Sequence, residues 1–210
     1  MDELGNLLAG YRRFRVERYE AEKARWRELA DGQAPRAIII ACSDSRTDPA
    51  TIFDTDPGDI FVVRNVANLV PPFEEGGGRH GVSAALEFGV TQLGIDEVVV
   101  MGHERCGGIQ AALTGKFHNA PAGEGGFVAN WMSQIDEPAA RIAASHGIGE
   151  DAARVLEEVA IRQSLANLRT FPFVAEREKE GALNLLGCHF SISEGQLFLL
   201  DEAEDVFRPV

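Results

Sequence analysis

Residues Ala37–Arg46 have the sequence AIIIACSDSR, in which an apolar, β-branched run passes into a short polar segment. A short β-branched run bounded by polar positions is typical of a strand that is buried on both faces, as in a parallel sheet. We therefore predict a strand over Arg36–Ala41, with Cys42 just beyond its carboxyl end.

A second segment repeats this arrangement about sixty residues later. Val98–Met101 form another apolar run, which is followed by Gly102–Gly108, GHERCGG. Ligands of an open α/β sheet bind just outside the carboxyl ends of its strands. We therefore expect Cys42, His103 and Cys106 to lie close together. Two thiols and one imidazole are a ligand set that favours zinc.

Strand and helix patterns alternate along the rest of the chain, which indicates an α/β fold with right-handed crossovers. We expect a mostly parallel central sheet, with about four parallel strands plus an antiparallel edge strand, flanked by helices. The further strands are predicted over Ile60–Val63, Leu183–Phe190 and, as the antiparallel edge, Gln196–Leu200. Helices are predicted from Asp48-Pro49, over Arg79–Leu93, from Cys106 through Leu113, over Phe127–Ser145 and over Asp151–Arg169.

The 210 residues fit a single domain, residues 1–210, with an N-terminal helical arm over residues 1–30. In that arm Leu4, Leu7 and Tyr11 recur at helical spacing among charged residues. The arm is either a solvated helix or an element that packs on a partner subunit.

The composition argues against several classes of partner. A formal net charge of −13 disfavours binding to nucleic acid or to an anionic membrane. No stretch approaches the roughly 18–20 consecutive apolar residues of a membrane span, and the N-terminus has no signal-peptide pattern. We therefore expect a cytoplasmic protein. The odd number of cysteines disfavours a disulfide framework, so Cys188 is expected to be a buried hydrophobe and His189 a core or interface residue.

Three expected ligands indicate a catalytic rather than a structural metal site. A structural zinc site has four protein ligands, whereas three leave a position open for water, whose pKa then falls. Two thiolates cancel the formal charge of Zn²⁺, so a nearby group must stabilise and direct hydroxide. Asp44, held by Arg46 through paired hydrogen bonds, would have a fixed direction and a lowered pKa. Alternatively, Asp44 swings in and ligates zinc itself, which closes the site.

These segments together resemble the β-class carbonic anhydrases. The chain carries that family's Cys-Ser-Asp-Ser-Arg segment at Cys42–Arg46 and its His-x-x-Cys-Gly-Gly segment at His103–Gly108, with the typical stretch Phe61–Pro72 between them. The resemblance implies a zinc lyase, a carbonate dehydratase, that reversibly hydrates CO₂ to bicarbonate and a proton by attack of zinc-bound hydroxide.

The resemblance also assigns roles to individual residues. It makes Cys42, His103 and Cys106 the ligands of one zinc ion per chain, and Asp44 and Arg46 the catalytic pair. It implies a homodimer or a dimer-based higher oligomer, in which some pocket residues come from the partner subunit. The residues that it implies for binding CO₂ or bicarbonate are Gln33, Phe61, Val66, Phe88 and Gly102.

One departure from the family pattern bears on regulation. Ile39 stands where the bicarbonate-inhibited subtype has Trp, so we expect the open form, with Asp44 paired to Arg46. Two alternative functions keep the zinc site: a related hydrolase acting on COS or CS₂, and a non-catalytic, zinc-stabilised scaffold that binds bicarbonate. Intact Asp44, Arg46 and Gln33 count against the scaffold, because a structural zinc needs none of them.

Overall fold

The computed structural model describes residues 3–76 and 78–210 and divides after Ala34 into two compact units. The N-terminal unit contains consecutive helices rather than one continuous helix: α1 (Glu3–Val16), α2 (Arg18–Ala21) and α3 (Lys23–Asp31). The rings of Phe14, Tyr19 and Trp26 pack together, with centroids 5.4 Å to 6.3 Å apart. Leu4 and Leu7, on the predicted apolar side of this arm, are not buried by the other residues of the N-terminal unit.

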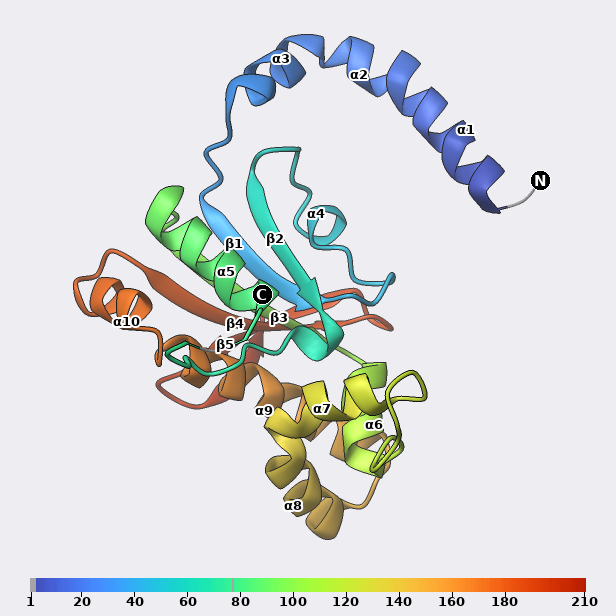
Figure 1. The fold of residues 1–210 in the computed structure, drawn as a ribbon, viewed down its shortest axis with the longest axis vertical. Helices are drawn as coiled ribbons and strands as arrows, with labels where there is room; N and C mark the ends of the chain where they lie inside the picture. The colour runs from blue at the N-terminus through green and yellow to red at the C-terminus, as the bar shows by residue number, and fades with distance from the viewer. Residues whose placement is uncertain (1–2, 77) are drawn as a thin grey trace. The chain divides into compact units, whose positions relative to one another are not determined.

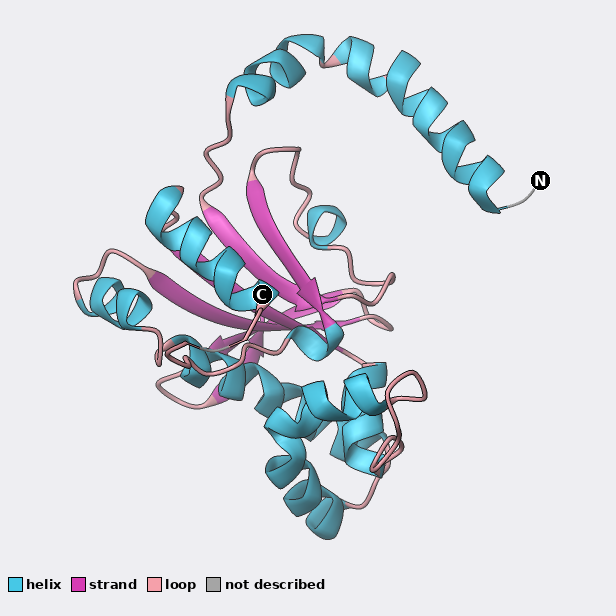
Figure 2. Ribbon diagram, viewed as in Figure 1, coloured by secondary structure: helices cyan, strands magenta, loops and turns pink. Residues whose placement is uncertain are grey.

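The second unit is built on one mixed sheet, which Figures 1 and 2 show with helices beside it. Within the described residues its strand order is β2-β1-β3-β4-β5-β6. The first four strands in that order are parallel, and β5 and β6 are antiparallel. This confirms the predicted fold class. The strands are β1 (Ala37–Cys42), β2 (Ile60–Asn65), β3 (Glu97–His103), β4 (Asn184–Ser191), β5 (Gln196–Asp201) and β6 (Val206–Pro209).

The strand predicted over Gln196–Leu200 is confirmed as the antiparallel β5, but it does not form the edge of the sheet, because β6 lies outside it. β6 spans just four residues, Val206–Pro209, and ends in a proline. Proline has no N–H for a sheet ladder and is therefore confined to edges. A strand of four residues gives little periodicity to recognise.

Alternate residues of the central strands pack on opposite faces of the sheet. On one face Ile38, Ile40 and Val100 pack against α5 (Gly81–Glu87), the π-turn η2 (Phe88–Gln92), α9 (Glu150–Leu168) and α10 (Pro172–Lys179). The helix predicted over Arg79–Leu93 is therefore split, and α10 was not predicted. On the other face Ile39 and Val99 pack with Ile52 of α4 (Pro49–Ile52). The predicted cap of α4 is confirmed, since Asp48 accepts a hydrogen bond from the Thr51 N–H.

A group of helices packs beyond the carboxyl ends of the parallel strands (Figure 1). Its members are α6 (Gly107–Thr114), α7 (Gly126–Met132), the 3-10 turn η3 (Ser133–Ile135) and α8 (Asp136–His146), which pack with α9. The continuous helix predicted over Phe127–Ser145 is wrong. Pro138 lacks an N–H and its ring conflicts with the carbonyl of the residue four positions earlier, so the helix is interrupted before it.

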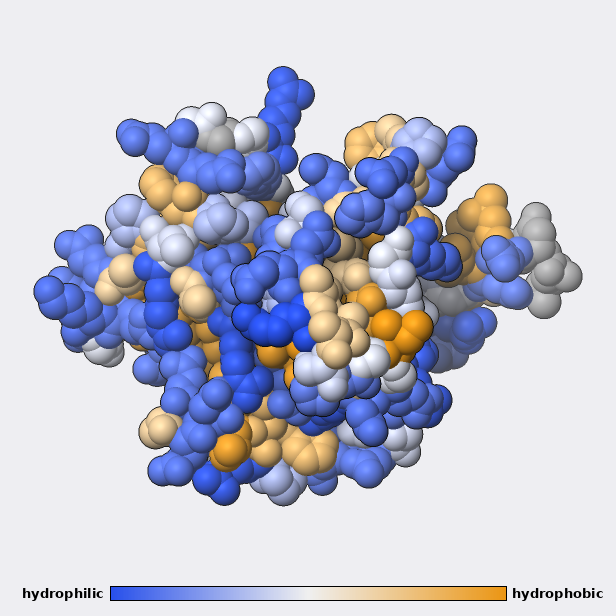
Figure 3. Space-filling view, turned by 90° about the horizontal axis from the view of Figure 1, so that it is seen from below, coloured by the Kyte–Doolittle hydropathy of each residue, from blue (hydrophilic) through white to orange (hydrophobic). Residues whose placement is uncertain are grey.

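The face of the molecule seen in Figure 3 is mainly hydrophilic, as expected for the net charge of −13. Figure 3 shows apolar residues, in orange, in patches among the blue hydrophilic ones. Among the described residues, no helix combines the length and the apolar character that crossing a membrane requires.

Candidate metal centre

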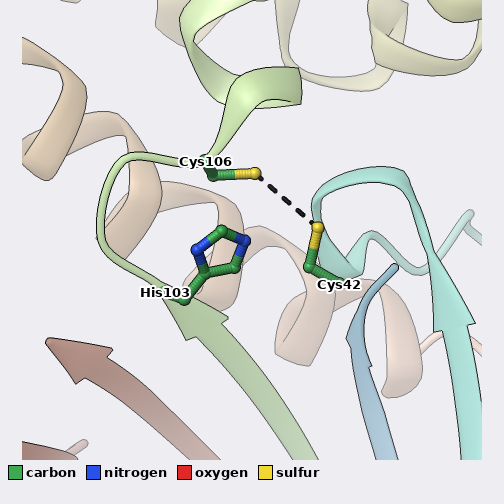
Figure 4. Close-up of side chains that lie close together, drawn as sticks. All are labelled: Cys42, His103 and Cys106. Carbon is green, nitrogen blue, oxygen red and sulfur yellow. Dashed lines mark hydrogen bonds between the residues drawn. The ribbon is translucent and has the colours of Figure 1, made fainter. Parts of the chain in front are cut away.

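The sheet brings the two predicted cysteine segments together. Cys42 ends β1 and His103 ends β3, and these strands are parallel neighbours with Ala41 opposite Met101. Cys106 is the N-cap of α6, which begins at Gly107. Figure 4 shows the side chains of Cys42, His103 and Cys106 pointing toward one another from these elements.

The geometry of this cluster fits a bound metal ion. The ligand atoms of the three side chains all lie within 4.8 Å of one another, and the two sulfurs are 3.9 Å apart. Two sulfurs on a tetrahedron with bonds of about 2.3 Å would lie at about this separation. His103 is 1% exposed, and its Nδ1 donates to the carbonyl of Glu104 at 2.9 Å. Its buried Nε2 has no hydrogen-bond partner in the described part of the chain, so its lone pair is available to a metal.

The backbone around the cluster stabilises negative sulfur. The backbone N–H groups of Asp44 and Ala67 act to lower the pKa of the Cys42 thiol, and those of Gly108 and Ile109 act in the same direction on Cys106. The hydrogen bond from Cys106 lowers the pKa of Cys42 to about 4. The same hydrogen bond and burial raise the pKa of Cys106 above that of a free thiol. The two sulfurs thus share one proton, which is released when such a pair binds a metal.

Asp44 and Arg46 form the expected ion pair beside the cluster. Arg46 donates from Nε to Oδ1 of Asp44 at 2.9 Å and from Nη2 to Oδ2 at 2.7 Å. Its backbone N–H adds a third hydrogen bond to Oδ1 at 3.0 Å. These contacts hold the pKa of the Asp44 carboxyl well below its usual range. Oδ2 of Asp44 lies 4.0 Å from Nε2 of His103, so an ionised carboxylate faces the cluster.

Arg64, to which the sequence analysis gave no role, binds the loop that carries Cys42 and Asp44. From β2 its Nε donates to the Cys42 carbonyl at 2.9 Å, and its Nη2 donates to the Asp44 carbonyl at 2.6 Å. A guanidinium can serve several carbonyls at once because its donors are arranged in a fork. Arg64 is a charged residue near the carboxyl end of the predicted strand that starts at Ile60, and in the structure it lies opposite Ala41 of β1. A charged residue at that end of a strand is the signal that could have identified it.

Glu157 is a second residue that sequence reasoning missed, and it binds the other cysteine segment. Its Oε1 accepts a hydrogen bond from the backbone N–H of Cys106 at 3.1 Å. Its Oε2 accepts from Nε2 of His189 at 2.9 Å. His189 is fully buried, as predicted, and so is Cys188.

The expected substrate-binding residues do not all meet at the cluster. The rings of Phe61 and Phe88 contact each other, with centroids 6.2 Å apart. Phe61 lies opposite Ile38 and Asn65 lies opposite Cys42. Four residues of strand, about 13 Å, therefore separate Phe61 from the level of the cluster.

Val66 and Gly102 lie closer to the cluster. A Cβ on Gly108, in the first turn of α6, would come within 2.7 Å of Val66 Cγ1. A Cβ on Gly102 would come within 2.7 Å of Ile161 Cδ1, so close packing of β3 on α9 requires glycine there. Gln33 is exposed in the segment after α3, within the N-terminal unit. The binding roles of these residues stay predictions.

Comparison with known proteins was made by sequence and by structure. A family model described as carbonic anhydrase matches residues 37–197. A carbonic anhydrase of Pseudomonas aeruginosa is 38% identical over 205 residues, which cover 96% of this chain and 90% of that protein. The solved structure of the β-carbonic anhydrase CcaA superimposes with a TM-score of 0.91 at 30% identity and covers 100% of both chains. A structure of two tetrameric β-carbonic anhydrases from Sordaria macrospora gives a TM-score of 0.71 at 27% identity, covering 94% of this chain and 93% of that chain.

Proposed function

The chain belongs to the β-class carbonic anhydrases, and from this premise we propose which of its residues hydrate CO₂. Its cysteine–histidine–cysteine cluster fits zinc-dependent hydration. The observation that supports the assignment of roles is the juxtaposition of that buried cluster with the carboxylate of Asp44, which Arg46 holds at both oxygens.

Cys42, His103 and Cys106 would hold one zinc ion per chain. When bound, the ion would supply Lewis-acid chemistry that lowers the pKa of water and makes a nucleophile available near neutral pH. His103 presents Nε2 because its Nδ1 is engaged by the Glu104 carbonyl. The backbone N–H groups at Asp44 and Ala67 favour the anionic form of Cys42, and those at Gly108 and Ile109 favour that of Cys106 against the burial and the neighbouring sulfur that raise its pKa.

Asp44 faces the cluster, where its carboxylate would accept a hydrogen bond from the attacking water and direct the lone pair of that water at CO₂. Arg46 keeps Asp44 ionised and fixes its plane through the paired hydrogen bonds. Arg46 also donates from Nη2 to the Arg105 carbonyl at 3.1 Å, which ties the two cysteine segments to each other. Asp44 and Arg46 are therefore the catalytic pair, and Gln33 binds the substrate oxygen.

The apolar side of the pocket is completed by a second copy of the chain. Within one chain the Phe61–Phe88 pair lies about 13 Å along β2 from the level of Cys42. Phe88 and Val66 are 48% and 37% exposed, which leaves an apolar surface for a partner to cover. A relative described as tetrameric supports a dimer-based oligomer. An active monomer in light scattering would contradict this assignment.

The variant Asp44→Asn tests the catalytic role. We expect zinc content to remain one ion per chain and kcat to fall about 10²- to 10⁴-fold, the range for loss of a positioned acid or base. Turnover is measured by stopped-flow CO₂ hydration with a pH indicator, and zinc by elemental analysis. Asp48→Asn is the matched control, because it removes a charge from the same loop and keeps a good helix cap.

Two outcomes would contradict the proposal. Unchanged turnover in Asp44→Asn would remove the role given to this carboxylate. Turnover of COS or CS₂ that exceeds turnover of CO₂ by the zinc-loaded protein would instead support the related hydrolase.

A further inference from the structure

Glu157 is a buried acidic residue with no part in the proposed reaction. It lies on α9 and is 3% exposed. Burying a carboxylate is strongly unfavourable unless hydrogen bonds and a counter-charge compensate it. Both of its oxygens are engaged, Oε1 by the Cys106 N–H and Oε2 by His189. The carboxylate therefore lies between a proposed zinc ligand and a buried histidine.

The hydrogen bonds around His189 have one consistent direction. Arg154 carries no acceptor, so its Nη1 donates to Nδ1 of His189, at 2.5 Å. The proton of the neutral imidazole is then on Nε2, from which it is donated to Glu157. Arg154 is held in turn by Glu158 at 2.9 Å and lies over the ring of Phe198. Nη1 of Arg154 also lies 3.2 Å from Nε2 of His189, but the shorter contact to Nδ1 assigns the hydrogen bonds, and Arg154, His189 and Glu157 thus form a relay.

The relay ends at the backbone N–H of Cys106, which needs a hydrogen-bond acceptor. Cys106 is the N-cap of α6 and is 2% exposed, so its N–H would be buried without an acceptor if Glu157 were absent. The hydrogen bond to Glu157 therefore fixes the backbone from which Sγ of Cys106 projects, 3.9 Å from the sulfur of Cys42.

We propose that Glu157 is a positioning residue that holds Cys106 in its metal-binding orientation, with His189 and Arg154 holding Glu157 in turn. The inference rests on the proposed function in one respect, the assignment of Cys106 as a zinc ligand. Glu157 itself contacts neither zinc nor substrate, and it acts through the Cys106 backbone.

Glu157→Gln is the direct test. If the glutamine oxygen accepts from the Cys106 N–H, the glutamine NH₂ faces the Nε2–H of His189, and two donors meet. If His189 instead carries its proton on Nδ1, that N–H meets the donor of Arg154. We expect zinc affinity to fall about 10- to 100-fold, as for other partners that orient metal ligands. Affinity is measured by competition for Zn²⁺ with a chromophoric chelator, and ligand geometry by the thiolate-to-metal absorption of the Co²⁺-substituted protein.

Glu137→Gln is the matched control. It removes the same charge from α8, where the exposed carboxylate pairs with Arg141 and, among the described residues, forms no ion pair with a member of the relay. We expect wild-type zinc affinity and a wild-type Co²⁺ spectrum. Unfolding of the metal-free proteins is followed in parallel. A Glu157→Gln protein that is less stable but keeps both wild-type zinc affinity and the Co²⁺ spectrum would overturn the proposal.

A second variant keeps the test decisive if Glu157→Gln does not fold. Arg154→Met keeps an apolar side chain over Phe198 and removes the donor to His189. We expect a smaller loss of zinc affinity in the same direction, and unchanged affinity would then overturn the inference. Cys106→Ala separates the two proposals: if it retains wild-type zinc affinity, the ligand assignment itself fails, whereas its loss of zinc beside a normal Glu157→Gln protein refutes the role of Glu157 alone.

Discussion

The two cysteine segments of the metal centre are held by charges of opposite sign. Arg64 donates to the carbonyls of Cys42 and Asp44, whereas Glu157 accepts from the N–H of Cys106. The difference follows from the backbone at each place. A loop that leaves a strand presents carbonyls without ladder partners, and a helix that begins presents free N–H groups. Each segment is thus matched by the charge that its unpaired backbone groups require.

The two anchors also differ in their distance from solvent. The side chain of Arg64 is 28% exposed and that of Asp44 19%, whereas that of Glu157 is 2% exposed. The Cys42 segment carries the proposed catalytic carboxylate and lies on the solvent side. The Cys106 segment lies against the interior. We infer that the first anchor mainly controls catalysis and the second mainly controls metal affinity.

The largest expected effect removes a ligand from either segment. Cys42→Ser and Cys106→Ser replace a thiolate by a hydroxyl that stays protonated. We expect both to weaken zinc binding by more than the roughly 100-fold that loss of an orienting partner produces, and to abolish CO₂ hydration with it. Zinc per chain after dialysis against a chelator is the measurement.

Cys188→Ala is the control for these variants. Cys188 is buried on β4, outside the cluster. It should lose stability but keep its zinc. If only one of the two serine variants lost zinc, the segments would not be joint parts of one site, and the comparison would fail.

The sequence predicted the ligands better than it predicted their anchors. Cys42 and His103 each follow an apolar run, so a local pattern places them at one end of a parallel sheet. Arg64 and Glu157 reach the cluster through contacts that span 22 and 51 residues of chain. No local pattern specifies such a contact.

A weaker signal for Glu157 was nevertheless present. It lies at helical spacing from Ala153, Ala160 and Ile161, which are buried, whereas Glu158 lies off that stripe. An acidic residue on the apolar face of a helix requires a buried partner. The pattern thus indicates that Glu157 is engaged, although not that its partners are Cys106 and His189.

A smaller effect is expected from Arg64→Lys. A lysine keeps the charge but lacks the fork that serves the carbonyls of Cys42 and Asp44 together. We expect Asp44 to be misplaced and kcat to fall by up to about 100-fold, the order that a displacement of about 1 Å produces. Zinc affinity, measured by chelator competition, should fall less than in Glu157→Gln. If Arg64→Lys and Glu157→Gln lost equal zinc affinity, Arg64 and Glu157 would contribute equally to metal binding, which would contradict the inferred difference between them.

The smallest effect concerns the start of α4, on the same loop as Asp44. Asp48 accepts from the Thr51 N–H at 3.0 Å and from its hydroxyl at 2.9 Å. Its ion pair with Arg64 spans 3.3 Å with a side chain 47% exposed, and such pairs contribute little. Asp48→Ala should therefore lower the free energy of unfolding in urea by about 1 kcal/mol, the usual value of a lost helix cap.

Asp48→Asn separates the cap from the ion pair, because asparagine caps a helix as well as aspartate but carries no charge. We expect it to unfold like the wild-type protein. Zinc affinity should be unchanged in both variants, since Arg64 still binds the carbonyls of Cys42 and Asp44. If Asp48→Asn lost kcat as Arg64→Lys does, the orientation of Arg64 would depend on Asp48, and the anchor of the Cys42 segment would be a pair of charges. Both cysteine segments would then be held by linked cations and anions. The anchor of the Cys42 segment would differ from the buried relay at Cys106 only in its exposure to solvent.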